Sequence, residues 1–158
     1  MQVLVLYYSK SGNTKRLAEH VASGVEKAGL KAVLRSTEEV KQEDFLEASG
    51  IVAGSPVYFG VMAWQLKKVF DEFVSVRRKM ENKVGAVFAS GGHHSGGKET
   101  TMFSIIQCMM IYGMLIAGDP MSASGHYGVA SLGPPDLDAA GDAEKLGTRV
   151  AELCRKMG

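Results

Sequence analysis

The sequence predicts an α/β fold in which one doubly wound, five-stranded parallel sheet, in the order 2-1-3-4-5, carries helices on both faces. Apolar, β-branched segments alternate with amphipathic segments along the whole chain. Loops rich in small or aromatic residues follow the first, third and fourth apolar segments. The chain of 158 residues is long enough for a substantial core and contains no repeat or low-complexity linker. We therefore expect residues 1–158 to form a single domain of three layers, α/β/α.

The first half of the chain supplies three of the expected strands. Residues 2–8 (QVLVLYY) form an apolar strand, and the helix over residues 14–28 has apolar side chains at helical spacing and ends at a glycine. Residues 31–36 alternate in polarity, which indicates a more exposed edge strand. Residues 38–48 are polar, with room for one helical turn, and residues 51–54 form a short buried strand.

The second half continues the alternation. The expected elements are a helix over residues 63–79, a strand over 84–89, a helix over 99–112, a strand over 114–117, a loop-like stretch over 119–140 and a terminal amphipathic helix. The carboxyl ends of the parallel strands meet at one edge of the sheet, so the three loops should lie side by side. One ligand could then touch all three.

Composition excludes several classes of function. The net charge of +1 and mean hydropathy of 0.00 give no basic patch for nucleic acid. Cys108 and Cys154 have neither disulfide-framework nor metal-site spacing, so we expect reduced thiols and no metal. The longest apolar run, residues 108–117, is shorter than the roughly 20 residues of a membrane span. The chain opens directly in a strand, without a signal peptide, and we expect a cytoplasmic protein with no membrane insertion.

The first loop has the residues of an anion cradle. Backbone N–H groups and the helix dipole at a strand-to-helix turn attract anions, and hydroxyls can donate further hydrogen bonds. An ordinary capped turn is the alternative. The candidate ligand-binding residues here are Ser9, Lys10, Ser11, Gly12, Asn13 and Thr14.

The second loop carries adjacent aromatic residues at the mouth of the expected crevice. Such side chains can stack on a planar ring, although they can also simply cap the core. The candidates are Pro56, Val57, Tyr58, Phe59 and Gly60.

The third loop is rich in glycine, which lets the backbone approach a ligand closely, and its histidines can exchange protons. A solvated histidine pair is the alternative. The candidates are Ser90, Gly91, Gly92, His93, His94, Gly96 and Gly97. The run from Gly92 to Lys98 also imitates a nucleotide P-loop, but Glu99 stands where such a loop needs Ser or Thr.

The first loop resembles the phosphate loop of flavodoxin-like proteins, T/S-x-T/S-G-x-T. Residues 54–67, 90–101, 112–114 and 126–128 resemble segments of the Trp-repressor-binding-protein type of NAD(P)H:quinone oxidoreductase. This resemblance implies a flavodoxin-like fold with tightly bound FMN, its phosphate on the first loop and its ring between the second and third loops. It also implies that Tyr112 and His126 lie near the ring, either from the same chain or across a subunit interface.

The resemblance further implies an FMN-dependent enzyme that passes electrons from NAD(P)H to a quinone or another small acceptor. His126 or His93 would be the catalytic residue that delivers protons. A flavodoxin-type electron carrier without substrate turnover is the first alternative, and an interaction module that has lost its flavin is the second.

The chain departs from the pattern of these oxidoreductases at Tyr58, at the paired histidines, at Tyr112 and in lacking an insertion between the second and third strands. That insertion helps to assemble the tetramer of the family. The helix over residues 99–112 independently indicates self-association, because it is apolar all round. We expect it to form a homodimer or homotetramer contact, unless the stretch over residues 119–140 covers it.

Overall fold

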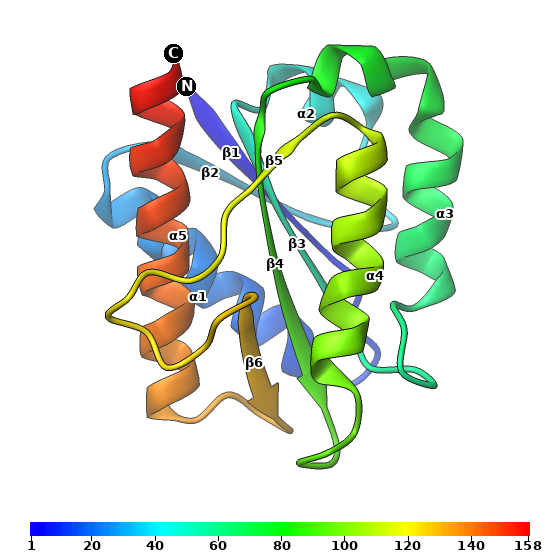
Figure 1. The fold of residues 1–158 in the computed structure, drawn as a ribbon, viewed down its shortest axis with the longest axis vertical. Coiled ribbons are helices and arrows are strands. Elements are labelled where there is room, and N and C mark those ends of the chain that lie inside the picture. Colours follow the sequence, from blue (N-terminus) through cyan, green and yellow to red (C-terminus); the bar gives the residue numbers. More distant parts are fainter.

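A parallel sheet in the order β2-β1-β3-β4-β5 forms the centre of the protein (Figure 1) in a computed structural model that describes residues 1–158. Its strands are β1 (Gln2–Tyr7), β2 (Lys31–Ser36), β3 (Gly50–Pro56), β4 (Val84–Gly91) and β5 (Leu115–Ile116). The predicted fold class and strand order are confirmed. The carboxyl ends of β1, β3 and β4 consequently lie at the same edge of the sheet.

Helices cover both faces of the sheet (Figure 1). Alternate residues of β1 separate the two halves of the core, since Val3 and Val5 pack on one side and Leu4 and Leu6 on the other. The helices α1 (Asn13–Lys27) and α5 (Leu137–Met157) cover the first side. The helices α2 (Gln42–Glu47), α3 (Trp64–Glu72) and α4 (Lys98–Ile111) cover the second.

The helices α1 and α5 approach each other closely at two glycines. A Cβ atom added at Gly24 would lie 1.9 Å from the carbonyl oxygen of Glu144, and one added at Gly147 would lie 2.1 Å from that of Val21. The absence of side chains at these positions therefore sets the distance between the two helices.

The helix expected over residues 63–79 ends earlier than predicted. The α-helical part stops at Glu72, and a 3₁₀ helix (Phe73–Met80) continues the chain. The segment after Glu72 contains Val74 and Val76, whose β-branched side chains lower the propensity for an α-helix. Val76 and Met80 still reach the core from the tighter helix.

The stretch expected to be loop-like, residues 119–140, contains a strand that the prediction missed. Strand β6 (Val129–Leu132) pairs in parallel with the last four residues of β4, whereas β5 pairs with the first two. Its four residues are too few for a periodic pattern, and only pairing with β4 identifies them. The helix α5 also begins earlier than expected, because a carboxylate oxygen of Asp136 accepts a 2.8 Å hydrogen bond from the Ala139 N–H.

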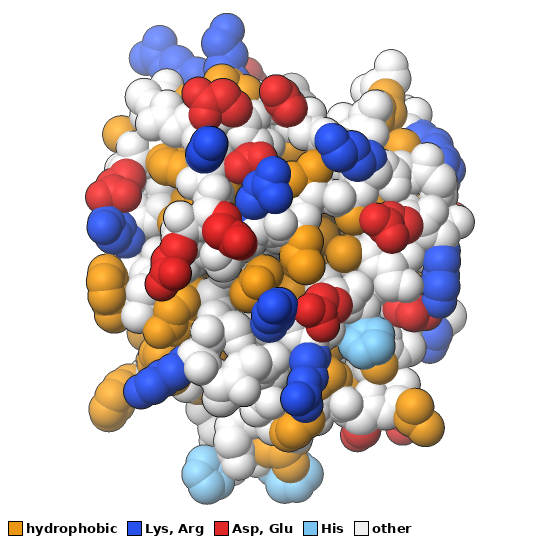
Figure 2. Space-filling view, turned by 180° about the vertical axis from the view of Figure 1, so that it is seen from behind, with side chains coloured by type: hydrophobic (Ala, Val, Ile, Leu, Met, Phe, Trp, Pro, Cys, Tyr) orange, Lys and Arg blue, Asp and Glu red, His pale blue; other side chains and the backbone are white.

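The surface mixes charges of both signs. In the face shown in Figure 2, basic and acidic side chains are interspersed among apolar ones. None of the helices combines the length and the apolar character needed to cross a bilayer.

Candidate functional site

The three loops at the carboxyl ends of β1, β3 and β4 contact one another. The Val57 N–H donates a 2.8 Å hydrogen bond to the carbonyl oxygen of Ser90, which joins the second loop to the third. The rings of Tyr8 and Tyr58 meet edge to face with centroids 6.3 Å apart, which joins the first loop to the second. The sequence-predicted residues of all three loops thus lie around one edge of the sheet.

The first loop has the properties of a phosphate site. Helix α1 begins after Gly12, which has φ 92° and makes no side-chain cap, and its first turn contains no acidic residue. The N–H groups of its first turn have no partner within the helix and can donate to an anion. The exposed side chains of Lys10, Ser11 and Lys15 add positive charge and a hydroxyl at the same turn.

Two buried hydroxyls connect this cradle to the third loop. The side-chain oxygens of Thr14 and Ser90 lie 2.7 Å apart, and both residues are buried. Ser9 contributes a further hydroxyl, whose oxygen accepts a 3.1 Å hydrogen bond from the Gly12 N–H. The donors therefore surround the helix terminus, and this arrangement fits the phosphate of FMN.

The second loop is a tight hairpin that displays an aromatic ring. Tyr58 and Val61 exchange two 3.2 Å backbone hydrogen bonds, and between them Phe59 and Gly60 have φ values of 51° and 80°. Positive φ at both central positions defines a type I′ turn, which strains a phenylalanine because of its Cβ atom. The Phe59 side chain is fully exposed. Its ring is free to stack on a planar ligand bound at this edge, which fits an isoalloxazine.

The third loop is held by Lys98, which in the sequence is recognisable only as the last residue of the P-loop-like run. The ammonium group of Lys98 donates hydrogen bonds to the carbonyl oxygens of His93 and His94, at 3.0 and 2.9 Å. Both histidine side chains are exposed. Lys98 therefore fixes the backbone from which the two imidazoles project.

His126 lies apart from the first two loops. It lines a cleft of about 430 Å³ that it shares with His94, Lys98 and Asp119, and no residue of the first or second loop lines this cleft. Burial, together with the nearby charge of Asp142, raises the pKa of Asp119 to about 6. The sequence offered no signal for this aspartate beyond its place after an apolar run. The structure brings no three His, Cys, Asp or Glu side chains together in a way that could hold a metal ion.

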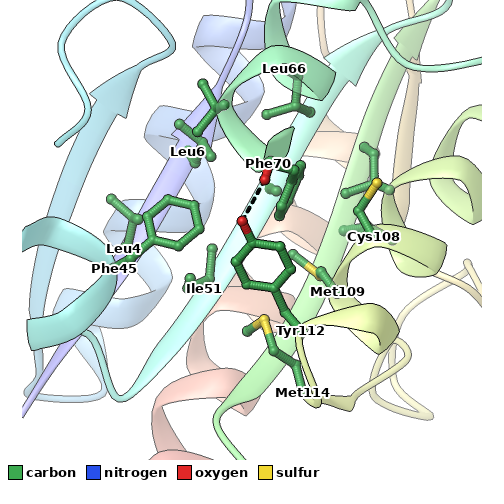
Figure 3. Close-up of a cluster of buried hydrophobic side chains, with 14 of the residues drawn as sticks. Leu4, Leu6, Phe45, Ile51, Leu66, Phe70, Cys108, Met109, Tyr112 and Met114 are labelled. Atoms are coloured by element: carbon green, nitrogen blue, oxygen red, sulfur yellow. Dashed lines mark hydrogen bonds between the residues drawn. The ribbon is translucent and has the colours of Figure 1, made fainter. Parts of the chain in front are cut away.

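Tyr112 is not at this edge, and the prediction that it lies near a ring bound to its own chain is wrong. Its hydroxyl donates a hydrogen bond to the carbonyl oxygen of Phe70 inside the core (Figure 3). Its ring packs against Phe45 and Phe70, and its exposed fraction is 5%. The residue follows α4, whose far end points towards the amino ends of the strands, so it lies away from the ligand edge of its own chain.

Comparison with known proteins agrees with this geometry. Residues 5–104 match the sequence pattern of the family described as Flavodoxin. An NAD(P)H dehydrogenase (quinone) of Archaeoglobus fulgidus is 34% identical over an alignment that covers 99% of this chain and 98% of the relative. A flavodoxin of Aquifex aeolicus is also 34% identical, over 96% of this chain and 85% of the relative.

Solved structures show the same similarity. A flavodoxin, WrbA-like protein from Agrobacterium tumefaciens superposes with a TM-score of 0.85 at 25% identity, over 99% of both chains. A flavodoxin from the domain Archaea superposes with a TM-score of 0.82 at 28% identity, over 98% of this chain and 99% of the other. The segment that matches the family, residues 5–104, contains all three loops and the first half of α4. The chain therefore belongs to the flavodoxin family.

Proposed function

We propose that this protein binds FMN across the three loops and acts as an oxidoreductase of the NAD(P)H:quinone type. The observation that carries the proposal is the joining of an uncapped helix N-terminus to an exposed aromatic hairpin at the switch between β1 and β3. In sheets of this order, ligands bind outside the carboxyl ends of the strands at that switch. Membership of the flavodoxin family supports FMN as the ligand.

Each loop then has a distinct task. The first loop, with Ser9, Ser11 and Thr14, holds the phosphate without needing an arginine. Phe59 and Tyr58 orient the ring and shield it from water, while the backbone N–H groups of the third loop face its polar edge. FMN, when bound, supplies the two-electron chemistry.

Proton exchange is assigned to the third loop. His93 is exposed on a backbone that Lys98 holds, so its imidazole can carry a proton between solvent and the ligand edge. His126 lies in a cleft that meets the third loop alone, which favours His93 over His126 as the proton-transfer residue.

The reaction is supported by the relatives named NAD(P)H dehydrogenase (quinone), which align with nearly the whole chain. The test loads the purified protein with FMN and follows menadione reduction with NADH and with NADPH. A parallel sample carries Ser11→Ala and Thr14→Ala together, which should lose FMN because each lost hydrogen bond to a charged group costs about 1.5–3 kcal/mol. Unchanged FMN retention in that variant would contradict the assigned phosphate site.

An electron carrier is the second candidate. The alignments with the quinone-reducing relatives extend over 188 to 197 positions, whereas those with relatives named flavodoxin extend over 158 to 164, close to the length of this chain. The shorter alignments favour a compact protein of flavodoxin size. A yellow, FMN-loaded protein that reduces no quinone with either nucleotide, but accepts electrons from a reductase protein, would establish this candidate in place of the first.

A further inference from the structure

The outer face of α4 exposes an apolar stripe. Phe103, Met110 and Ile111 keep 43%, 63% and 65% of their surface exposed. The sequence predicted a helix buried on all sides, but the stretch over residues 119–140 meets this face at Phe103, whose ring centroid lies 4.8 Å from that of Tyr127, and Met110 and Ile111 stay more exposed than Phe103. Spacings of seven and eight residues place the three side chains on one side of the helix, with Gln107 between them.

The apolar surface continues from α4 onto α3. A groove of about 690 Å³ runs between the two helices, and its lining includes Val61, Trp64, Lys67, Gln107 and Ile111. Trp64 is 67% exposed at the start of α3. The largest exposed apolar patch of a soluble monomer measures about 300–600 Å² and often marks a binding surface.

The stripe on α4 is self-complementary. Phe103 and Ile111 lie four residues before and four residues after Gln107. When two copies of α4 pack antiparallel about a two-fold axis at Gln107, Phe103 of one copy meets Ile111 of the other twice. The two Gln107 amides then face each other at the axis, where donor and acceptor groups can pair and fix the register.

The charges on α3 obey the same symmetry. Lys67 and Lys68 are followed one turn later by Asp71 and Glu72, with ion-pair distances of 2.6 and 3.6 Å within the helix. Lys67, Lys68 and Asp71 line the groove together with Gln107, so this charge pattern adjoins the residue placed at the proposed axis. In an antiparallel pair of α3 helices, the lysines of one copy therefore face the carboxylates of the other.

We propose that a second copy of this chain covers this face, giving a two-fold dimer in which α4 packs on α4 and α3 packs on α3. The exposed aromatic and aliphatic side chains provide on the order of 500 Å² per copy, and the lysine stems extend this towards the roughly 800 Å² per partner of a stable interface. A net charge of +1 leaves little repulsion between copies. The assembly goes beyond the proposed reaction and does not depend on a bound flavin.

The first experiment is sedimentation velocity of the full chain over a range of concentrations. The wild type should sediment as two copies. Ile111→Glu should raise the dissociation constant at least about 100-fold, because the interface would bury an unpaired carboxylate. Met121→Glu is the matched control, since Met121 is fully exposed outside this face and should leave the dimer intact. A wild-type monomer, or an assembly that Ile111→Glu leaves intact, would overturn the proposal.

The second experiment locates the axis. Gln107→Cys should form a disulfide-linked dimer under mild oxidation, because the two introduced thiols face each other. Cys154 is buried on the other side of the sheet, and Cys108→Ala is added to every variant in this experiment because Cys108 lines the groove. Glu152→Cys on the exposed side of α5 should not cross-link. A dimer that Gln107→Cys fails to cross-link would show that another face is used.

The third experiment tests the charge pattern. Lys67→Glu with Lys68→Glu should weaken the dimer at low salt, since like charges then face each other. Adding Asp71→Lys and Glu72→Lys restores complementarity and should restore the dimer. Failure of the fourfold variant to recover, while its circular dichroism matches the wild type, would remove α3 from the interface.

Discussion

Thr14 and Ser90 lie 76 positions apart in the sequence, yet their side-chain oxygens are 2.7 Å apart in the buried junction between the first and third loops. This contact joins the start of α1 to the end of β4. It ties the proposed phosphate cradle to the loop that carries the histidines.

Thr14→Val should lower the affinity for FMN by about tenfold or more. The substitution keeps the shape of the side chain but removes a hydroxyl that is worth about 1.5–3 kcal/mol when it bonds a charged group. Equilibrium titration of the apoprotein with FMN measures the change. Thr148→Val is the control, since its hydroxyl bonds the Gly24 carbonyl far from the loops. Equal losses in both variants would contradict a specific role for Thr14.

Phe59→Gly and Phe59→Ala should separate strain from stacking. Both remove the ring and should weaken FMN binding alike. Glycine adopts the φ of 51° without penalty, so Phe59→Gly should be more stable than Phe59→Ala by about 1 kcal/mol. Urea unfolding measures the stability, and flavin titration measures the binding. Wild-type FMN affinity in either variant would argue against a stacking role.

Lys98→Met should loosen the third loop. The methionine keeps most of the apolar stem but donates no hydrogen bond to the carbonyls of His93 and His94. Amide hydrogen exchange in residues 92–97 should accelerate about tenfold, as expected for the loss of about 1–1.5 kcal/mol. Lys31→Met, on the exposed edge of β2, provides the control. Unchanged exchange would mean that the glycine-rich backbone holds its own conformation.

Asp119→Asn should change how stability depends on pH. The pKa of Asp119 is raised to about 6 by burial and by Asp142, above the ordinary value of 3.8. Between about pH 4 and 6 the folded protein thus binds more protons than the unfolded chain, and its stability falls as the pH rises. Asp119→Asn should remove this decline and add about 1–2 kcal/mol at pH 7, after allowance for screening.

Urea unfolding at pH 4.5 and 7 measures the effect of Asp119→Asn. Asp138→Asn, at an exposed position near the start of α5, should keep the decline with pH. A wild type that is equally stable at both pH values would contradict the raised pKa.

Two glycines of α5 should respond to alanine in opposite directions. A Cβ atom at Gly147 would overlap the Val21 carbonyl of α1, whereas one at Gly141 meets no atom within 4 Å. Gly147→Ala should therefore cost about 1–3 kcal/mol or more, and Gly141→Ala should gain about 0.5–1 kcal/mol of helix propensity. Chemical denaturation of both variants measures the difference. A stabilised Gly147→Ala would show that the helices can separate without loss.

Local sequence patterns predict some features of the three loops and not others. The first loop is predicted by the change from strand to helix periodicity at residues 8–14, and the proposed anion cradle there needs only a helix terminus without a cap. The type I′ conformation of Phe59 was not predictable, because glycine or asparagine usually occupies such a position. The role of Lys98 was not predictable, because a lysine after a glycine-rich loop can bind a phosphate or bond the loop itself, and here its partners are carbonyl oxygens of the loop.

The sequence alone determined the alternation of strands and helices, the strand order and the edge at which the three loops meet, because periodicity and loop composition are local properties. Only the tertiary structure decided that Tyr112 lies in the core, that β6 completes the edge of β4 and that Phe103 and Ile111 remain exposed. These outcomes depend on which distant residues meet and how much surface they bury. The pattern of one segment does not contain that information.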